Sequence, residues 1–284
     1  MSFIEAAILG LLQGLTEFLP ISSSAHLRIA GELFGHDPGA TFTAITQIGT
    51  EVAVILYFWR DITRIISKWF RHFSPSSGIQ RGDSDVRLGW LVIIGTIPIG
   101  VVGYLAQEEI RGVFRSLWLV AIVLIVFGLL LGLADRLGHR RRDLAHMTYP
   151  HGLLIGLAQM LALVPGVSRS GATTAMGLAL GYTRPTAARF AFLLAIPAVL
   201  GSGVYELVNA LRGEGDVGSG AVVMPFGLAE TALATIVAFV VGYAVIAFLM
   251  RWLQTRSFLP FVVYRVALGG VLMVLLATNV LQPY

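Results

Sequence analysis

Long apolar runs dominate this chain and limit what it can fold into. Six stretches approach the ~20 residues that one helical crossing of a bilayer needs, at 42–59, 89–106, 116–135, 186–208, 225–250 and 260–281. Only 13% of the 284 residues are charged, against about 25% in soluble domains. Backbone groups in lipid are satisfied only in helices or closed barrels. We therefore predict an all-α, polytopic membrane helical bundle with a single integral membrane domain over residues 1–284.

Two further apolar regions, 3–33 and 151–181, do not behave as single spans. Each is broken near its centre by a proline and serines, LPISSS in the first and VPGVSRSG in the second. Proline removes a backbone donor and disfavours helix at the residue before it. Each half is too short to cross a bilayer alone. We expect both regions to be re-entrant helical hairpins.

The distribution of basic residues supports this topology. The loop 60–88 carries six basic residues against three acidic ones, 136–150 contains four arginines, and the turn near 251–256 contains two. Cytoplasmic loops are enriched in lysine and arginine. All three basic loops fall on the cytoplasmic side only if 151–181 enters and leaves the membrane on one face. The net charge of +4 is thus an orientation signal, and we expect no nucleic-acid partner.

The two hairpins also resemble each other in sequence. GLLQGLTEFLPISSSA begins at Gly10 and GLAQMLALVPGVSRSG begins at Gly156, with several identities at a constant offset of 146 residues. Three predicted spans follow each hairpin, and this odd number of crossings inverts one half relative to the other. We predict inverted repeats over 1–135 and 151–284, with hairpin tips that meet near the middle of the membrane.

The first tip carries an acid, hydroxyl groups and a histidine. Gln13 and Glu17 are four residues apart, so they share a helix face. After the break, His26 lies four residues from Ser22 and three from Ser23, and either serine could contact it. A serine beside a histidine can form an activated nucleophile. Alternatively, the serines only cap the second half-helix and His26 is a hydrogen-bonded structural residue.

The second tip has the features of an anion site. In PGVSRSGATT, Arg169 lies between Ser168 and Ser170 at the expected start of a half-helix, and Thr173 follows four residues later. A helix N-terminus favours anions, and the planar guanidinium suits phosphate oxygens. The simpler alternative is a structural ion pair between Arg169 and Glu17.

Three other charged residues lie inside predicted spans. Glu51 is expected to face the cavity or a polar neighbour. Arg189 and Arg265 are close to the cytoplasmic ends of their spans, and we expect their side chains to extend toward the interface.

Together the tips indicate phosphoryl transfer on a phosphorylated lipid within the membrane. At these residues the chain resembles the undecaprenyl-diphosphate phosphatase family, the bacitracin-resistance phosphatases of bacteria. The family's E/Q-x-x-x-E signature with its following proline, serines and histidine corresponds to QGLTEFLPISSSAH, and its P-G-x-S-R-S-x-x-T signature to PGVSRSGAT at 165–173. Gln13 takes the option without a carboxylate, which weakens any mechanism that needs two acids there.

The resemblance implies hydrolysis of undecaprenyl diphosphate to undecaprenyl phosphate and inorganic phosphate, which recycles the lipid carrier for peptidoglycan synthesis. It also implies a bacterial plasma (inner) membrane location, a site open to the extracytoplasmic side, dependence on a divalent cation (Mg²⁺ or Ca²⁺) and a homodimer.

From the spacing we assign Ser23 as the nucleophile, His26 as its base and Glu17 as a metal ligand or orienting acid, with Arg169 completing the catalytic set. Substrate binding is assigned to Gln13, Ser22, Ser24, Ser168, Ser170 and Thr173. His26 as nucleophile and direct attack by water remain alternatives. Rival functions are a secondary transporter or flippase of an anionic or phosphorylated substrate, since inverted repeats with broken helices are typical of transporters, and an intramembrane serine hydrolase.

Overall fold

The computed structural model describes residues 2–35, 37–80, 82–106, 116–212 and 226–282, and its regular elements in these ranges are all helical. In chain order they are α1 (Phe3–Thr16), α2 (Ser23–Phe34), α3 (Ala40–Tyr57), α4 (Trp59–Arg71), η1 (Pro75–Ser77), α5 (Ser84–Leu105), α7 (Leu117–Leu137), η3 (Leu144–His146), α8 (Tyr149–Met160), η4 (Leu161–Leu163), α9 (Arg169–Ala179), α10 (Arg184–Leu211), α11 (Leu228–Thr255) and α12 (Leu259–Ala277).

Six of the described helices are long and apolar enough to cross a membrane, namely α3, α5, α7, α10, α11 and α12. Each overlaps one predicted span, so the expected helical bundle is confirmed. The helices α10 and α11 contain 28 residues each and exceed the predicted lengths. Their length matches a helix that continues beyond the hydrocarbon region or crosses it at a tilt.

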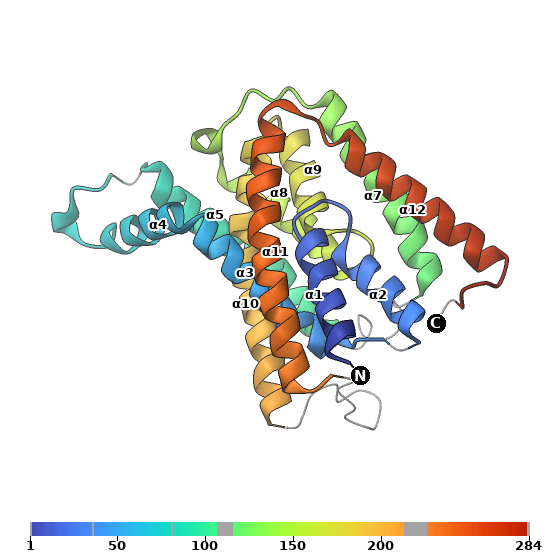
Figure 1. Ribbon diagram of the computed structural model, residues 1–284. Coiled ribbons are helices and arrows are strands. Elements are labelled where there is room, and N and C mark those ends of the chain that lie inside the picture. The colour runs from blue at the N-terminus through green and yellow to red at the C-terminus, as the bar shows by residue number, and fades with distance from the viewer. Residues whose placement is uncertain (1, 36, 81, 107–115, 213–225, 283–284) are drawn as a thin grey trace.

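The two broken regions form pairs of short helices, α1 with α2 and α8 with α9. Figure 1 shows that the pairs approach the centre of the molecule from opposite ends. At each break one serine has a positive φ, 74° at Ser22 and 69° at Ser168. Positive φ is uncommon for residues other than glycine, so both positions are strained. This geometry is compatible with re-entrant hairpins.

The same spacing of 146 residues separates Ser22 from Ser168 and also the first residues of α2 and α9, Ser23 and Arg169. The division into repeats over 1–135 and 151–284 stays a prediction, although local backbone geometry recurs at its offset.

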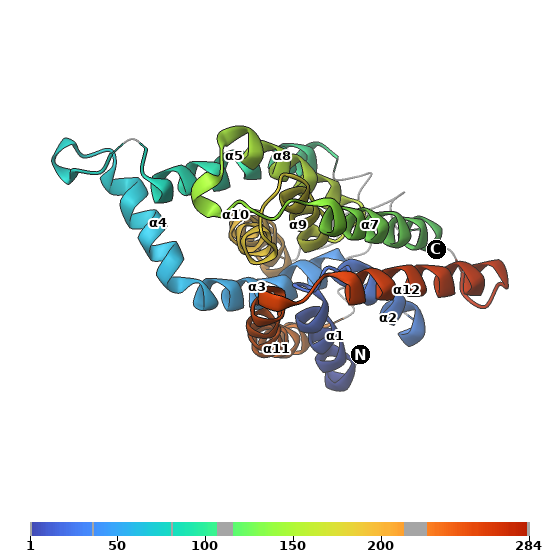
Figure 2. The same cartoon turned by 90° about the horizontal axis from the view of Figure 1, so that it is seen from above.

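The remaining helices pack around these pairs. The helix α1 packs on α11, α11 on α3, and α3 on α10, whereas α8 packs on α5 and α12 runs along α7. Viewed from above, α10 lies between the group containing α3 and the group containing α5 and α8 (Figure 2). The inner ends of the short helices are therefore enclosed by long ones.

The helix α4 extends sideways from the end of α3 and was not predicted (Figure 1). Its exposed residues include Arg60 and Arg71 as well as the apolar Ile66 and Phe70. A short helix of mixed character of this kind suits a membrane–water interface. Its sequence had predicted only part of a basic loop.

Two glycines let short helices approach long ones closely. A Cβ at Gly10 would lie 2.4 Å from the Ala234 carbonyl oxygen, and one at Gly156 would lie 2.4 Å from the Gly95 carbonyl oxygen. These contacts are between backbones, so no side-chain movement relieves them. Small residues at helix contacts are typical of membrane bundles.

Replacing Gly156 by alanine is expected to lower the stability of the detergent-solubilised protein by about 1–3 kcal/mol, the usual effect of overpacking. Thermal unfolding measures the change. Gly270→Ala is the matched control, because that site in α12 has no atom within 4 Å of the added carbon. Equal melting temperatures for Gly156→Ala and the control variant would contradict the proposed close packing.

Candidate active site

The two chain breaks meet inside the bundle. Arg169 Nη2 donates to Glu17 Oε1 at 2.7 Å, and the Ser170 hydroxyl donates to the Glu17 carbonyl at 3.2 Å. These contacts join residues more than 150 positions apart. The prediction that the tips meet with Arg169 beside Glu17 is confirmed.

The Glu17 carboxylate is the centre of this cluster. Its Oε2 accepts hydrogen bonds from Gln13 Nε2 at 2.8 Å and from the Ser23 hydroxyl at 2.6 Å. Gln13 lies one helical turn earlier on α1, as the spacing predicted, and Ser23 is the first residue of α2. The break therefore turns the chain so that two helices direct side chains onto one carboxylate oxygen.

Arg169 connects this cluster to α3 and α10. Its Nη2 also donates to Glu51 Oε1 at 3.0 Å, and its Nη1 donates to the Ala195 carbonyl at 3.2 Å. The described residues thus occupy three of the five guanidinium N–H donors. Arg169 is held by two carboxylates and still has donors for a phosphate group.

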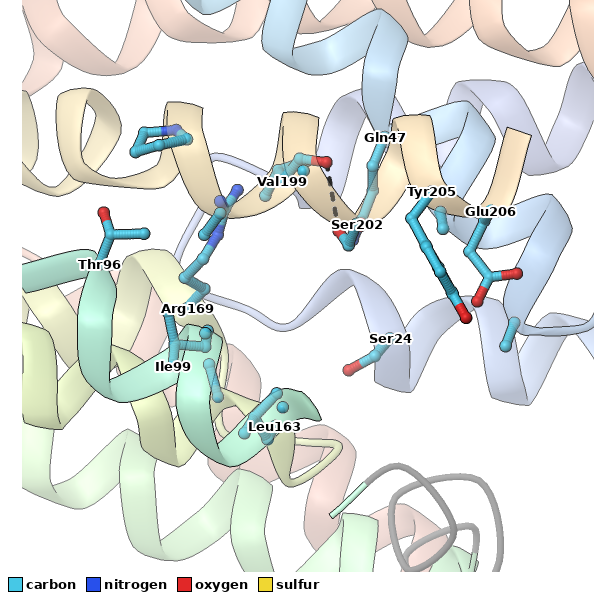
Figure 3. A pocket seen from close by; sticks show the side chains of 18 of the residues that line it. Ser24, Gln47, Thr96, Ile99, Leu163, Arg169, Val199, Ser202, Tyr205 and Glu206 are labelled. Atoms are coloured by element: carbon cyan, nitrogen blue, oxygen red, sulfur yellow. Dashed lines mark hydrogen bonds between the residues drawn. The ribbon is translucent and has the colours of Figure 1, made fainter. Parts of the chain in front are cut away.

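A cavity of about 600 Å³ leads to this cluster. In Figure 3 the Arg169 side chain reaches into it, with Thr96 and Ile99 on one side and Ser202, Tyr205 and Glu206 farther along. Polar groups gather at the inner end, where the wall contains Glu17, Ser22, Ser23, Ser24, Ser168 and Arg169. Small and apolar residues such as Gly100, Leu163 and Ala198 form much of the remaining wall. This lining suits an anionic head group attached to an apolar chain.

The serines of the two tips are arranged differently. Ser22 makes no side-chain cap and contacts the Ser24 hydroxyl at 3.1 Å, whereas the Ser168 hydroxyl accepts from Gly171 N–H at 3.2 Å and caps α9. The capping alternative, which concerned the serines of the first tip, is thus not seen at Ser22, and the serine that caps its helix is Ser168 of the second tip. Ser22, Ser24 and Ser168 all lie in the cavity wall.

The expected hydrogen bond between His26 and Ser23 is not among those of the described residues, because both side chains have other partners. The His26 Nδ1–H donates to the Ser22 carbonyl at 2.7 Å, and Nε2 is 2.7 Å from the Tyr264 hydroxyl of α12. In the register of α2, the Ser23 side chain points toward Glu17 while His26 points toward α12. Glu17 is thus the titratable group in contact with Ser23.

Three residues assigned to substrate binding lie outside the cavity wall. Gln13 is fully buried against Glu17, the Thr173 hydroxyl donates to the Arg169 carbonyl at 2.7 Å, and Ser170 bonds to the backbone of the first tip. In this structure they stabilise the tips.

The chemistry of the site fits a hard divalent cation. The buried oxygens Gln13 Oε1 and Glu51 Oε2 have no hydrogen-bond partner among the residues that the structure describes, and Glu17 lies in the cavity wall. Among the described residues, no group of three or more His, Cys, Asp or Glu side chains is suited to hold a metal alone. Mg²⁺ is often held by one or two carboxylates together with substrate phosphates. The site therefore suits a cation that binds with the substrate.

Two charged residues make contacts that the sequence did not predict. Glu51 was noticed as an acid within a span, and the structure makes Arg169 its polar neighbour. The expectation that Arg265 extends toward the interface is wrong, because this side chain is fully buried and bonds to backbone carbonyls of both tips. Every residue type has a backbone carbonyl, so the sequence does not indicate which carbonyls would accept hydrogen bonds from Arg265.

The chain is similar to known proteins over nearly its whole length. The chain is 63% identical to the undecaprenyl-diphosphatase of Clavibacter michiganensis over 279 residues, which is 98% of each chain. It is 59% identical over 284 residues to that of Micrococcus luteus, covering 99% of this chain and all of the relative, and 52% identical over 287 residues to undecaprenyl-diphosphatase 2 of Agrobacterium fabrum, covering 99% and 98%. The family model described as bacitracin resistance protein BacA matches residues 6–271, and the chain, a multi-pass membrane protein, belongs to this family.

Proposed function

We propose that the protein hydrolyses undecaprenyl diphosphate to undecaprenyl phosphate and inorganic phosphate, and so recycles the lipid carrier for peptidoglycan synthesis. The observation that carries this proposal is the joint cluster of Ser23, Glu17 and Arg169, which the two tips form at the inner end of one cavity. A nucleophile, an acid–base group and a phosphate-binding cation are the groups that this reaction needs.

In the proposed reaction the Ser23 oxygen attacks the terminal phosphorus. Glu17 accepts the hydroxyl proton, because its carboxylate is 2.6 Å from the Ser23 oxygen. Arg169 binds the oxygens on which negative charge develops. Undecaprenyl phosphate leaves with the proton from Glu17. Glu17 then deprotonates the water that attacks the phosphoserine, and it returns this proton to the Ser23 oxygen as phosphate is released. In this proposal His26 is not the base. It positions Ser22, the residue before Ser23, through its hydrogen bond to the Ser22 carbonyl.

A divalent cation would be held by Glu17 and Glu51, with Gln13 Oε1 as a further oxygen donor. When bound, it supplies positive charge that neutralises the diphosphate. The protein's own residues still have to orient the head group. Arg169 is held in place by Glu17 and Glu51, and its remaining N–H donors would bind the phosphate oxygens.

The cavity opens away from the basic loops. Its wall includes Ala40 at the start of α3, Tyr104 near the end of α5 and Glu206 near the end of α10. The loop 60–88 and the turn near 251–256 lie at the other ends of these or neighbouring helices. By the positive-inside rule we assign the opening to the extracytoplasmic side of a bacterial inner membrane. We also propose a homodimer, as the resemblance implies.

Purified protein is expected to release phosphate from undecaprenyl diphosphate in detergent, and a chelator is expected to abolish this release until Mg²⁺ or Ca²⁺ is restored. A transporter or flippase would release none, because transport requires no bond cleavage. Absence of phosphate release from folded, metal-supplied protein would refute the proposed function.

The nucleophile can be identified by trapping. Rapid acid quench with labelled lipid diphosphate is expected to leave an acid-stable phosphoserine that Ser23→Ala lacks. An acid-labile, base-stable adduct lost in His26→Ala would instead identify a phosphohistidine. If no adduct forms under either condition, water attacks directly and Ser23 binds substrate.

A further inference from the structure

Arg265 of α12 is completely buried and makes five hydrogen bonds. Its Nε donates to the Leu124 carbonyl at 3.1 Å, its Nη1 to the Pro20 and Val167 carbonyls at 3.1 Å each, and its Nη2 to the Gly166 and Val167 carbonyls at 2.7 and 3.1 Å. A guanidinium has five N–H donors, so every donor is used. A buried charge is costly unless fully hydrogen-bonded, and here carbonyl dipoles provide that bonding.

The acceptors belong to both chain breaks. Pro20 lies two residues before the strained Ser22, and Gly166 and Val167 immediately precede the strained Ser168. Strained backbone persists only where its surroundings enforce it. One side chain therefore joins the first break, the second break and α7 at the level of the cluster.

The neighbouring residue on α12 strengthens this connection. The Tyr264 hydroxyl is 2.7 Å from His26 Nε2, and the two rings are nearly parallel with centroids 5.6 Å apart. His26 in turn bonds to the Ser22 carbonyl. The helix α12 thus contacts the first break both before Ser22, at Pro20, and after it, at His26.

We propose that Arg265 is a positioning residue for catalysis, which holds the two breaks against each other and thereby places Arg169 relative to Glu17 and Ser23. This inference rests on the proposed phosphatase function. Arg265 is absent from the cavity wall and acts through the backbone of the tips. A small displacement of catalytic groups can cost about 10²-fold in rate.

Two variants distinguish the hydrogen bonds of Arg265 from its charge: Arg265→Lys keeps the positive charge, and Arg265→Gln removes it. Lysine keeps the charge but has three donors on one atom, so it cannot span four carbonyls. We expect both variants to lose about 10–100-fold in kcat per folded molecule, with KM for undecaprenyl diphosphate changed much less. Arg184→Lys is the matched control, because Arg184 pairs with Asp135 outside the cavity wall and should keep kcat.

The distance between the tips gives a second readout. The chain has no cysteine, so spin labels can be placed at Leu15→Cys and Leu161→Cys, two exposed positions beside the breaks. We expect electron-resonance distances between the labels to broaden in Arg265→Lys. If Arg265→Gln does not fold, Gly128→Ala provides a milder variant, because its Cβ would lie 3.0 Å from Arg265 Cβ, and it should reduce kcat in the same direction.

Two results would overturn the inference. One is wild-type kcat and an unchanged distance distribution in folded Arg265→Lys, which would make charge alone sufficient. The other is a lowered yield or melting temperature with unchanged kcat per folded molecule, which would make Arg265 merely structural. Failure of the wild-type protein to release phosphate would refute the proposed function itself. That outcome is distinct from the two above, which concern only the Arg265 variants.

Discussion

Replacing Arg169 by lysine is expected to lower kcat about 10²–10³-fold while the protein remains folded. The variant lacks the guanidinium N–H donors that would stabilise the negative charge of the transition state. Lysine keeps the positive charge but not the planar fork. In the structure one Nη atom bridges Glu17 and Glu51 and the other bonds to the Ala195 carbonyl. A single ammonium group cannot keep these three contacts and also bind phosphate oxygens. Phosphate release, normalised to folded protein, measures the effect.

Arg189→Lys is the matched control for this substitution. Arg189 lies on α10, pairs with Asp61 and has its guanidinium carbon 6.0 Å from the Phe58 ring centroid, but it does not line the cavity. We expect its kcat to stay near the wild-type value. Near-normal turnover in a folded Arg169→Lys variant would show that the ion pair with Glu17 is only structural.

Replacing Glu17 by glutamine is expected to lower kcat about 10²–10⁴-fold, the usual contribution of a general base. Glutamine is nearly isosteric and can still accept a hydrogen bond from Ser23, so packing is retained. It cannot take the hydroxyl proton, and it leaves the Arg169 charge with one carboxylate fewer. Turnover of undecaprenyl diphosphate under saturating substrate and cation tests this.

Glu32→Gln serves as the control for Glu17→Gln. Glu32 is on α2 but pairs with Arg28 at 2.6 Å, outside the cavity wall. Its kcat should be unchanged. If Glu17→Gln turned over like Glu32→Gln, the base would have to be another group, and His26 would return as a candidate despite its contacts with Ser22 and Tyr264.

The features that the sequence predicted well are those with local signals. The six spans follow from apolar runs, and the contact between Arg169 and Glu17 follows from buried charge in two broken helices. Both features follow from the cost of polar groups inside a membrane, which does not depend on how a helix is rotated.

The features that were missed depend on register between distant segments. Whether His26 contacts Ser23 or Tyr264 depends on how α2 is rotated against α12, and those partners are 238 residues apart. The acceptors of Arg265 are backbone carbonyls exposed by the breaks, which any residue type could supply. The helix α4 was missed because its apolar residues are interspersed with arginines in a basic loop.

The recurrence of the strained serines has a consequence for the number of sites in the molecule. Each strained serine is followed by the first residue of a helix, and these two equivalent positions hold Ser23 in one half and Arg169 in the other. Identical halves would offer two nucleophiles or two cations. Because the same backbone position carries a hydroxyl in one break and a guanidinium in the other, the proposed mechanism uses one composite centre within the described residues. We therefore expect that neither predicted half turns over substrate without the other.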